Sequence, residues 1–431
     1  MTGSDAHATS RSDEARTDTP TRNSLVRVQI TGFRSIRSAS FAPGPVSALV
    51  GDPGAGKSNL LAAIRAALDP TTAPLGPNDA VKNDGSSVTI RLDTADGSWV
   101  SAEGTPPSMS IRAAGEMPLA LYLPARLRAG MVMAPTRNHD STLLKAATLI
   151  GGEDGGGDAH PPPGITEAAH GLVKGMEALV SEGVRGLVVL IEEPELFLPP
   201  QVQRYLYRLL RQLSEGGNQI LYSTHSPSFL NVARLHELVL IENDPERGTL
   251  LAQPKPLSAD DEFRAYSEFD TARSELFLAR AAVLVEGLTE RLALPFVFHA
   301  LGYDADRERI SIVECGGKAN IPLMARVSRA VGIPFVAVHD RDAPKKGNPN
   351  LSERQLNQLI GEVAGEENRI ELAPDFEGIS GLRGQKHKPA RAWRRFAQLG
   401  AEDMPADLRR IVERAVEVAG PTDRFGEHSH G

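Results

Sequence analysis

The chain has 431 residues, 41% of them hydrophobic and 24% charged, which are ordinary globular proportions spread over more than one domain. Its net charge of −8 argues against a protein that is basic throughout and binds nucleic acid over its whole surface, while a local basic groove stays compatible with it. No apolar run reaches the roughly 18 residues of a membrane-spanning helix, and a single cysteine excludes an intramolecular disulfide, so we expect a cytoplasmic protein without membrane contact.

The N-terminal third begins with a polar arm and continues with strand and helix patterns. Residues 1–24 lack the apolar core of a secretory signal, and their polar composition predicts disorder. Residues 25–36 alternate between apolar and polar side chains, as a half-buried strand does. The apolar run 46–50 predicts a buried strand, and 59–68 has the spacing of a helix. Residues 70–163 are less regular, with two short strands, VTIRL and SMSIRA.

Two series of alternating strands and helices follow, and they predict an α/β fold with largely parallel sheets. The first has a helix at 167–182, strands at 186–191, 219–224 and 235–243, and a helix after the first of these strands. The second has strands at 281–287, 310–317 and 334–342 and helices at 290–301 and 321–332. We therefore expect a disordered arm 1–24, a P-loop domain 25–258, a linker 259–278, a second α/β domain 279–396, and a C-terminal helix and flexible tail 397–431.

The string GDPGAGKS matches the phosphate-binding P-loop without a mismatch, and it lies between a predicted strand and a predicted helix. Gly51, Gly54 and Gly56 let backbone N–H groups surround the phosphates of ATP. Lys57 is expected to reach the β- and γ-phosphates, and the hydroxyl of Ser58 to bind Mg²⁺. An ordinary glycine-rich turn is the alternative, which the matching context disfavours.

Two later strands supply further candidates for the nucleotide site. The strand in LVVLIEEPELFL ends at Glu192 and Glu193, so one carboxylate can hold Mg²⁺ while the other faces the attacking water. The strand in LYSTHSP ends beside His225, which can reach the γ-phosphate. The alternatives are a solvated acidic strand end and a structural histidine.

These strings resemble the ABC-type ATPases of the SMC and RecF group, and most of all the OLD family (overcoming lysogenisation defect). The resemblance implies that Glu192 is the Walker B acid, Glu193 the catalytic base and His225 the switch histidine, with Pro194 and Glu195 in the D-loop. It also implies a homodimer with ATP between the P-loop and the partner's signature motif. The chain departs from the family here, because only Gly164-Ile165-Thr166-Glu167 occupies the place of LSGGQ. ATP binding is therefore a firmer expectation than fast hydrolysis.

Acidic residues recur at the strand and loop ends of the second series. Glu286 and Glu290 lie four apart, Asp340 and Asp342 follow one strand, and Glu377 lies in ELAPDFEG. Each alone is more often a solvated surface charge, but the ends of parallel strands converge on one edge. Clustered carboxylates suit Mg²⁺ or Mn²⁺, and two such ions can cut a phosphodiester.

The order E-G-x-T-E, G-G-K-x-N and D-x-D resembles the Toprim domain of OLD-family nucleases, over about 280–390. The resemblance implies that Glu286, Asp340 and Asp342 bind one metal, that Glu290 and Glu377 serve the second, and that a lysine stabilises the transition state. That lysine is Lys388, with Lys386 as the close alternative. Buried packing is the preferred interpretation of two other residues nearby, Cys315 and His339.

Residues 378–401 contain six basic side chains and no acidic one. Within this stretch we expect a surface that contacts DNA phosphates rather than a merely solvated helix face. Its proposed DNA-binding residues are Lys386, Lys388, Arg391, Arg394 and Arg395.

The leading hypothesis is an ATP-regulated DNA endonuclease or nickase of the OLD type, with a partner helicase as an open possibility. A non-cleaving, RecF-like DNA clamp is the alternative, and the intact acidic motifs favour the nuclease. A transporter ATPase is disfavoured by the second domain. A Toprim topoisomerase is disfavoured because no strand-passage domain fits in the remaining length.

Overall fold

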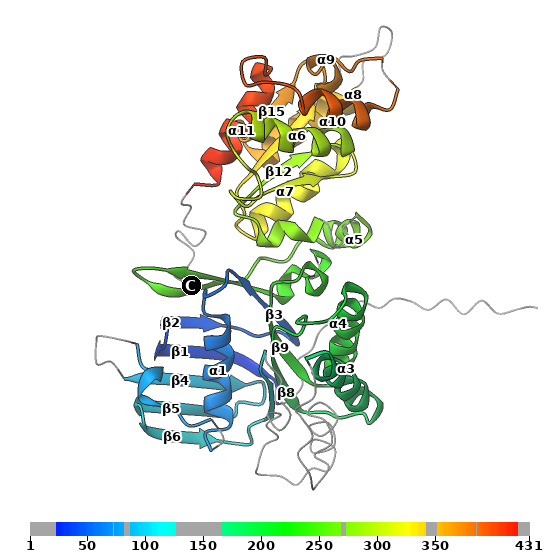
Figure 1. Ribbon diagram of the computed structural model, residues 1–431. Coiled ribbons are helices and arrows are strands. Elements are labelled where there is room, and N and C mark those ends of the chain that lie inside the picture. Colours follow the sequence, from blue (N-terminus) through cyan, green and yellow to red (C-terminus); the bar gives the residue numbers. More distant parts are fainter. Residues whose placement is uncertain are drawn as a thin grey trace, which may run out of the picture.

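The structure is a computed structural model, which describes residues 23–125, 165–230, 232–268, 273–341, 351–384 and 386–420, apart from residues 72 and 82–86. Residues 1–22 of the predicted arm 1–24, residues 421–431 of the predicted C-terminal helix and tail, and the metal-ligand candidate Asp342 lie outside these ranges. Figure 1 shows the P-loop half at the bottom and the second α/β half at the top.

A six-stranded sheet in the order β11-β10-β3-β9-β8-β7 forms the centre of the first half. Each neighbouring pair is parallel except β10 and β11, which confirms the expected largely parallel sheet. Strands β3, β8 and β9 are almost entirely buried, as in a sheet that is covered on both faces. The strands are β3 (Val46–Gly51), β7 (Leu119–Leu123), β8 (Leu187–Glu192), β9 (Gln219–Thr224), β10 (Leu238–Asp244) and β11 (Gly248–Ala252).

Helix α1 (Lys57–Leu68) lies between this sheet and a second, antiparallel one (Figure 1). The antiparallel sheet has the order β2-β1-β4-β5-β6. Its strands are β1 (Leu25–Phe33), β2 (Ile36–Phe41), β4 (Val88–Thr94), β5 (Trp99–Thr105) and β6 (Ser108–Ala114). The two short strands expected in this less regular stretch, VTIRL and SMSIRA, are present in β4 and β6, and the structure adds β5 and β7. Strand β5 is not predicted from the sequence, because only Val100 and Ala102 of its seven residues are buried and the apolar alternation is therefore short.

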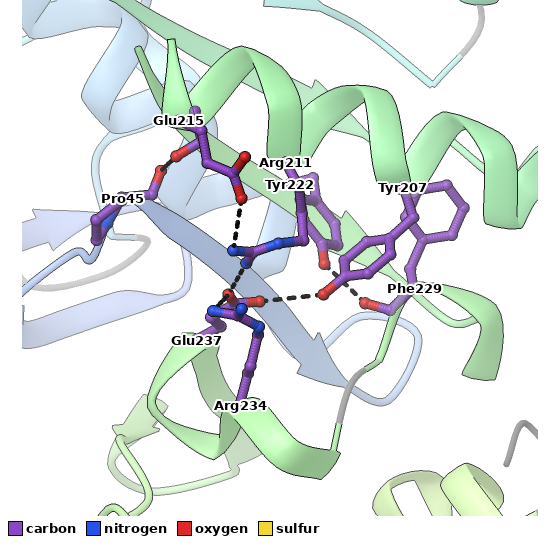
Figure 2. A network of polar contacts seen from close by, with 9 residues as sticks. Pro45, Tyr207, Arg211, Glu215, Tyr222, Phe229, Arg234 and Glu237 are labelled. Carbon is purple, nitrogen blue, oxygen red and sulfur yellow. Dashed lines mark hydrogen bonds and ion pairs between the residues drawn. The ribbon is translucent and has the colours of Figure 1, made fainter. Parts of the chain in front are cut away.

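Helices α3 (Ile165–Ser181) and α4 (Pro200–Glu215) cover the other face of the six-stranded sheet. A polar network fixes α4 to the segments that follow β9 (Figure 2). Arg211 and the hydroxyl of Tyr207 both donate to the buried Glu237, and Tyr222 donates to the carbonyl of Phe229 at 2.7 Å. Burial raises the pKa of Glu237, and the charge of Arg211 opposes that rise. The network holds the loop after β9 against the helix that follows Glu193.

A four-stranded parallel sheet in the order β13-β12-β14-β15 forms the second half. Helices α6, α10 and α11 cover one face, and α7 and α8 the other. The strands are β12 (Ala281–Val285), β13 (Ile310–Glu314), β14 (Phe335–Asp340) and β15 (Arg369–Leu372). The helices are α6 (Leu288–Ala300), α7 (Ile321–Ala330), α8 (Leu351–Ala364), α9 (Phe376–Ile379), α10 (Lys388–Phe396) and α11 (Ala406–Val418).

Two segments that were expected to lie outside the domains pack into them. The stretch predicted as a linker forms α5 (Ala259–Glu268) and the 3₁₀ turn η4 (Arg273–Leu278). Its Leu276 and Phe277 are buried in an apolar core that continues from the first half into the second, so it does not behave as an open linker. Helix α11 packs against β12 and β14 as part of the second half. Among the described residues, none of the helices has the length and apolar character needed to cross a membrane.

Candidate nucleotide and metal sites

The P-loop connects β3 to α1, and close contacts require glycine at two of its positions, 51 and 56. Gly56 has a φ of 111°, and a Cβ there would lie 2.3 Å from the hydroxyl oxygen of Thr249. A Cβ on Gly51 would lie 2.0 Å from the carbonyl oxygen of Ile241 in β10. Because both positions exclude a side chain, the loop is held tightly against the β10–β11 hairpin.

Lys57 begins α1 and points back into the P-loop. Its ammonium donates to the carbonyls of Gly51 and Asp52, each at 2.9 Å, and the side chain is buried. Burial lowers the pKa of Lys57, and the nearby carboxylate of Glu193 opposes the shift. The next residue, Ser58, is exposed in the first helical turn. The lysine and the hydroxyl therefore lie at the helix N-terminus, where phosphates bind favourably.

The carboxylates after β8 take different positions. Glu192 ends the strand and accepts a hydrogen bond from the hydroxyl of Tyr122 at 2.7 Å. Glu193 has a φ of 46°, a strained value for a residue with a side chain, and its N–H donates to the carbonyl of Ser223 in β9. The hydrogen bond to β9 thus holds the turn at Glu193 in place. Residues with a side chain and a positive φ of this kind are often found at functional sites.

His225 follows β9 and completes this cluster. Its Nε2 lies 3.8 Å from Oε1 of Glu193, and its backbone N–H donates to Glu195 at 2.6 Å. Burial lowers the pKa of His225, and the charge of Lys57 acts in the same direction, so the neutral form is favoured. The structure therefore brings Lys57, Glu193 and His225 close to one another. It adds Tyr122, which sequence reasoning missed because it lies 70 positions from its partner Glu192.

The candidate for the signature motif is only partly described. Its first residue, Gly164, lies outside the described residues, and α3 begins at the next residue. The helix predicted at 167–182 is therefore present and begins slightly earlier.

At the carboxyl end of the second sheet, acids from separate elements meet. Strands β12 and β14 are parallel neighbours, so Glu286 after β12 lies beside Asp340 at the end of β14. The N–H of Asp340 donates to Oε1 of Glu286 at 2.7 Å. The carboxylate of Asp340 in turn accepts from the N–H of Phe376 at 2.7 Å, at the start of α9. These contacts hold together the ends of β12 and β14 and the start of α9, which carry the predicted metal ligands Glu286, Asp340 and Glu377.

Glu290 and Glu377 belong to the same cluster. Burial raises the pKa of Glu290 to about 7, and the charges of Asp340 and Glu377 add to the rise. Lys388 forms an ion pair with Glu377, and this hydrogen bond raises the pKa of the lysine. The structure thus places Lys388 at the acids, whereas Lys386 is exposed and forms no ion pair with any acid among the described residues.

Carboxylates that crowd together in this way raise each other's proton affinity, and a divalent cation relieves that repulsion. Their oxygen-only donors fit Mg²⁺ or Mn²⁺ in kind. Within the described ranges, however, no three acidic, His or Cys side chains are arranged closely enough to hold an ion. Asp342, one of the predicted ligands, is not among those residues.

Lys318 is a residue that sequence reasoning passed over. It lies in the G-G-K-x-N string, is 7% exposed, and donates to the carbonyl of Asp340 at 2.5 Å. It also forms an ion pair of 3.3 Å with Glu353 of α8. A lysine directly after two glycines was the available signal. His339 is buried, with Nδ1 3.0 Å from the carbonyl of Asp340, and Cys315 is buried too, so packing is confirmed for both.

Helix α10 presents its basic residues outward, next to the acids. Arg391, Arg394 and Arg395 are exposed, while Ala392 and Phe396 are buried in the apolar core of the second half. Trp393 is 51% exposed and makes an edge contact with Phe296 of α6. The helix therefore offers a basic surface with an aromatic side chain, beginning at Lys388.

Comparisons with known proteins agree with this description. Residues 277–342 match the family described as "Overcoming lysogenization defect protein-like, TOPRIM domain", and residues 175–231 match "AAA domain, putative AbiEii toxin, Type IV TA system". The OLD nuclease of Thermus scotoductus is 37% identical over 267 residues, 57% of this chain and 51% of that protein. The Old nuclease of Escherichia phage P2 is 29% identical over 161 residues, 36% of this chain and 28% of that protein.

The chain thus spans about half or less of the length of these curated relatives. Among solved structures, the C-terminal region of the Burkholderia pseudomallei OLD protein is 19% identical. That alignment covers 33% of this chain and 98% of that structure, with a TM-score of 0.28, which is too low to bear on the fold. The matched segments imply the use of a nucleotide and of a divalent metal. The chain therefore contains a segment similar to an AAA domain, followed by a segment similar to the OLD-like Toprim domain, and is related in sequence to the OLD nucleases.

Proposed function

We propose that this protein is an ATP-binding and ATP-hydrolysing DNA endonuclease, or nickase, of the OLD type. The observation that carries the proposal is the convergence of Glu286, Glu290, Asp340 and Glu377, with Lys388, at one end of an OLD-like Toprim sheet. The names of the related OLD nucleases support DNA or RNA cleavage, and the basic face of α10 supports a nucleic-acid substrate.

In this proposal the acids hold Mg²⁺ or Mn²⁺, which supplies an activated water and stabilises the leaving oxygen of the phosphodiester. Asp340 and Glu286 are held in place by the contacts between their loops, and Asp342 would complete their set. Lys388 places a positive charge where negative charge develops in the transition state. Arg391, Arg394 and Arg395 would position the DNA backbone without reading its sequence.

In the ATPase half, Lys57 and the P-loop amides would hold the phosphates of ATP, and Ser58 and Glu192 the magnesium ion. Glu193 would orient and deprotonate the attacking water, with His225 beside it. We further propose the two α/β domains expected from the sequence, with η4 and α11 packed into them rather than lying outside them. We also propose a cytoplasmic homodimer that closes over ATP, and we keep a partner helicase as an open possibility.

A nicking assay with supercoiled plasmid tests the function. With Mg²⁺ or Mn²⁺ present, the protein is expected to convert supercoiled plasmid to the open-circular form. Addition of EDTA should stop the reaction. The assay is run both with and without ATP to measure the effect of the nucleotide on the nicking rate. Mn²⁺ is expected to work at least as well as Mg²⁺, because its coordination geometry is less demanding. If DNA is bound but not cut with any divalent metal, the alternative of a non-cleaving clamp replaces the nuclease.

The two candidate lysines can be separated in the same assay. Lys388→Ala is expected to slow nicking by about 100-fold or more, the usual effect of losing a group that stabilises transition-state charge. Its metal requirement should stay unchanged because the lysine is not a ligand. Lys386→Ala, two residues away, is the matched comparison: it removes a proposed contact with DNA phosphates, so it should weaken plasmid binding but cut at nearly the wild-type rate when plasmid is saturating. The reverse ranking would assign the catalytic role to Lys386.

A further inference from the structure

An ion pair connects the Toprim half directly to the P-loop. Arg309, which precedes β13, donates to both carboxylate oxygens of Asp52, the second residue of the P-loop, at 2.6 and 2.5 Å. The same guanidinium donates to the carbonyl of Leu278 at 3.0 Å. Two parallel hydrogen bonds fix both the distance and the orientation of the pair. This contact spans 257 positions in the chain.

The backbone of Arg309 is held so that its side chain points at the P-loop. Its φ is 57°, a conformation that residues with side chains seldom adopt. Its N–H donates to the carbonyl of Asp306, and its carbonyl accepts from the N–H of Arg280. Strain of this kind persists only where surrounding contacts enforce it, and it clusters at functional positions.

Asp52 lies where a negative charge opposes the binding of a nucleotide. Its carbonyl accepts from Lys57, the residue expected to meet the β- and γ-phosphates, and its carboxylate is close enough to act on the charge of that lysine. A bound triphosphate would bring several negative charges to the same loop. Unless Asp52 is neutralised, like charges at this distance weaken binding.

A cavity of about 530 Å³ borders the ion pair. Residues of both halves line it, among them Gly54 of the P-loop, Asn243 of β10, and Arg280 and Arg309 of the Toprim half. The pair itself is partly exposed, with 40% and 57% of the two side chains accessible, so it adds little stability on its own. The pair can instead affect nucleotide binding, because both residues line the cavity that borders the P-loop.

We propose that Arg309 is a positioning residue for the nucleotide, supplied by the Toprim half: it neutralises Asp52 and draws its carboxylate away from the phosphate site. The inference rests on the proposed binding of ATP at the P-loop. Affinity for a nucleoside triphosphate then depends on the Toprim half being docked. By thermodynamic reciprocity, a bound nucleotide strengthens the docking of the Toprim half in return.

A double-mutant cycle on the full chain tests this, with MgATP and MgADP affinities measured by calorimetry. Arg309→Ala is expected to weaken ATP binding by about five-fold or more, within the usual range of coupling between sites. The penalty should be larger for ATP than for ADP, because repulsion grows with the charge of the ligand. Asp52→Asn leaves the charge of Arg309 without its carboxylate partner and should bind ATP at least as tightly as wild type. Adding Asp52→Asn to Arg309→Ala should restore affinity, since no carboxylate remains to be neutralised.

Arg307→Ala is the matched control, because Arg307 lies two positions away, is 71% exposed and pairs only with its neighbour Glu308 among the ion pairs seen. If Arg309→Ala proves unstable, Arg309→Lys takes its place. It keeps the charge and should retain most of the ATP affinity. The inference is overturned if Arg309→Ala binds ATP as tightly as wild type or more tightly. It is also overturned if the double variant binds ATP as weakly as Arg309→Ala alone. If instead the wild-type protein binds no ATP, or binds it equally well after Lys57→Ala, the P-loop assignment itself fails.

Discussion

Replacing Asp340 by Asn is expected to abolish nicking of supercoiled plasmid while ATP affinity stays at the wild-type level. Loss of a residue that merely orients a metal ligand typically costs about 10- to 100-fold, so loss of the ligand charge itself should exceed 100-fold. The amide is the sharper choice over Ala, because its oxygen can still accept the hydrogen bond from the N–H of Phe376. The change therefore removes charge with little loss of structure.

The matched control is Asp403→Asn, the same substitution at an exposed position of the same half. It should cut like wild type. Glu286→Ala should be as inactive as Asp340→Asn, although it also loses a contact with the backbone of Asp340. The decisive protein is the double substitution of Asp340 and Asp342. Wild-type nicking by that protein would place the activity elsewhere or reveal a contaminant.

Glu193→Gln is expected to bind ATP normally and to hydrolyse it about 100- to 10,000-fold more slowly, the range attributed to general acid–base catalysis. The amide keeps the size of the side chain but cannot take a proton from water. The backbone of Glu193 is held by Ser223 through its own N–H, so the turn should survive the substitution. Single-turnover and steady-state ATPase rates, together with calorimetric affinity, check both parts of the prediction.

Glu246→Gln provides the control, since it makes the same change at an exposed position in the β10–β11 turn. Hydrolysis by Glu193→Gln at the wild-type rate, measured above background, would remove Glu193 from the mechanism. A loss of ATP binding would instead show that the carboxylate helps to shape the P-loop, where it already acts on the charge of Lys57.

The sequence by itself determined the local chemistry of both halves. The P-loop string, the paired glutamates and the D-x-D string are contiguous, and each lies directly after an apolar strand, so their places at strand ends follow from local pattern alone. The largely parallel sheets followed from strands alternating with helices. Burial of Cys315 and His339 was predictable for the same reason, since both continue apolar strands.

Only the tertiary structure decided which distant residues meet. Tyr122 reaches Glu192, and Arg309 reaches Asp52, through contacts whose partners carry no shared local signal. Lys388, and not Lys386, pairs with Glu377 because α10 begins at Lys388. The K-P string by itself does not show where the helix begins relative to the acids. The stretch expected as a linker looked polar because α5 begins with Asp260, Asp261 and Glu262, yet Leu276 and Phe277 beyond it enter a core made by segments far away in the chain. Packing of that kind is a property of the assembled sheets and helices, and local composition does not encode it.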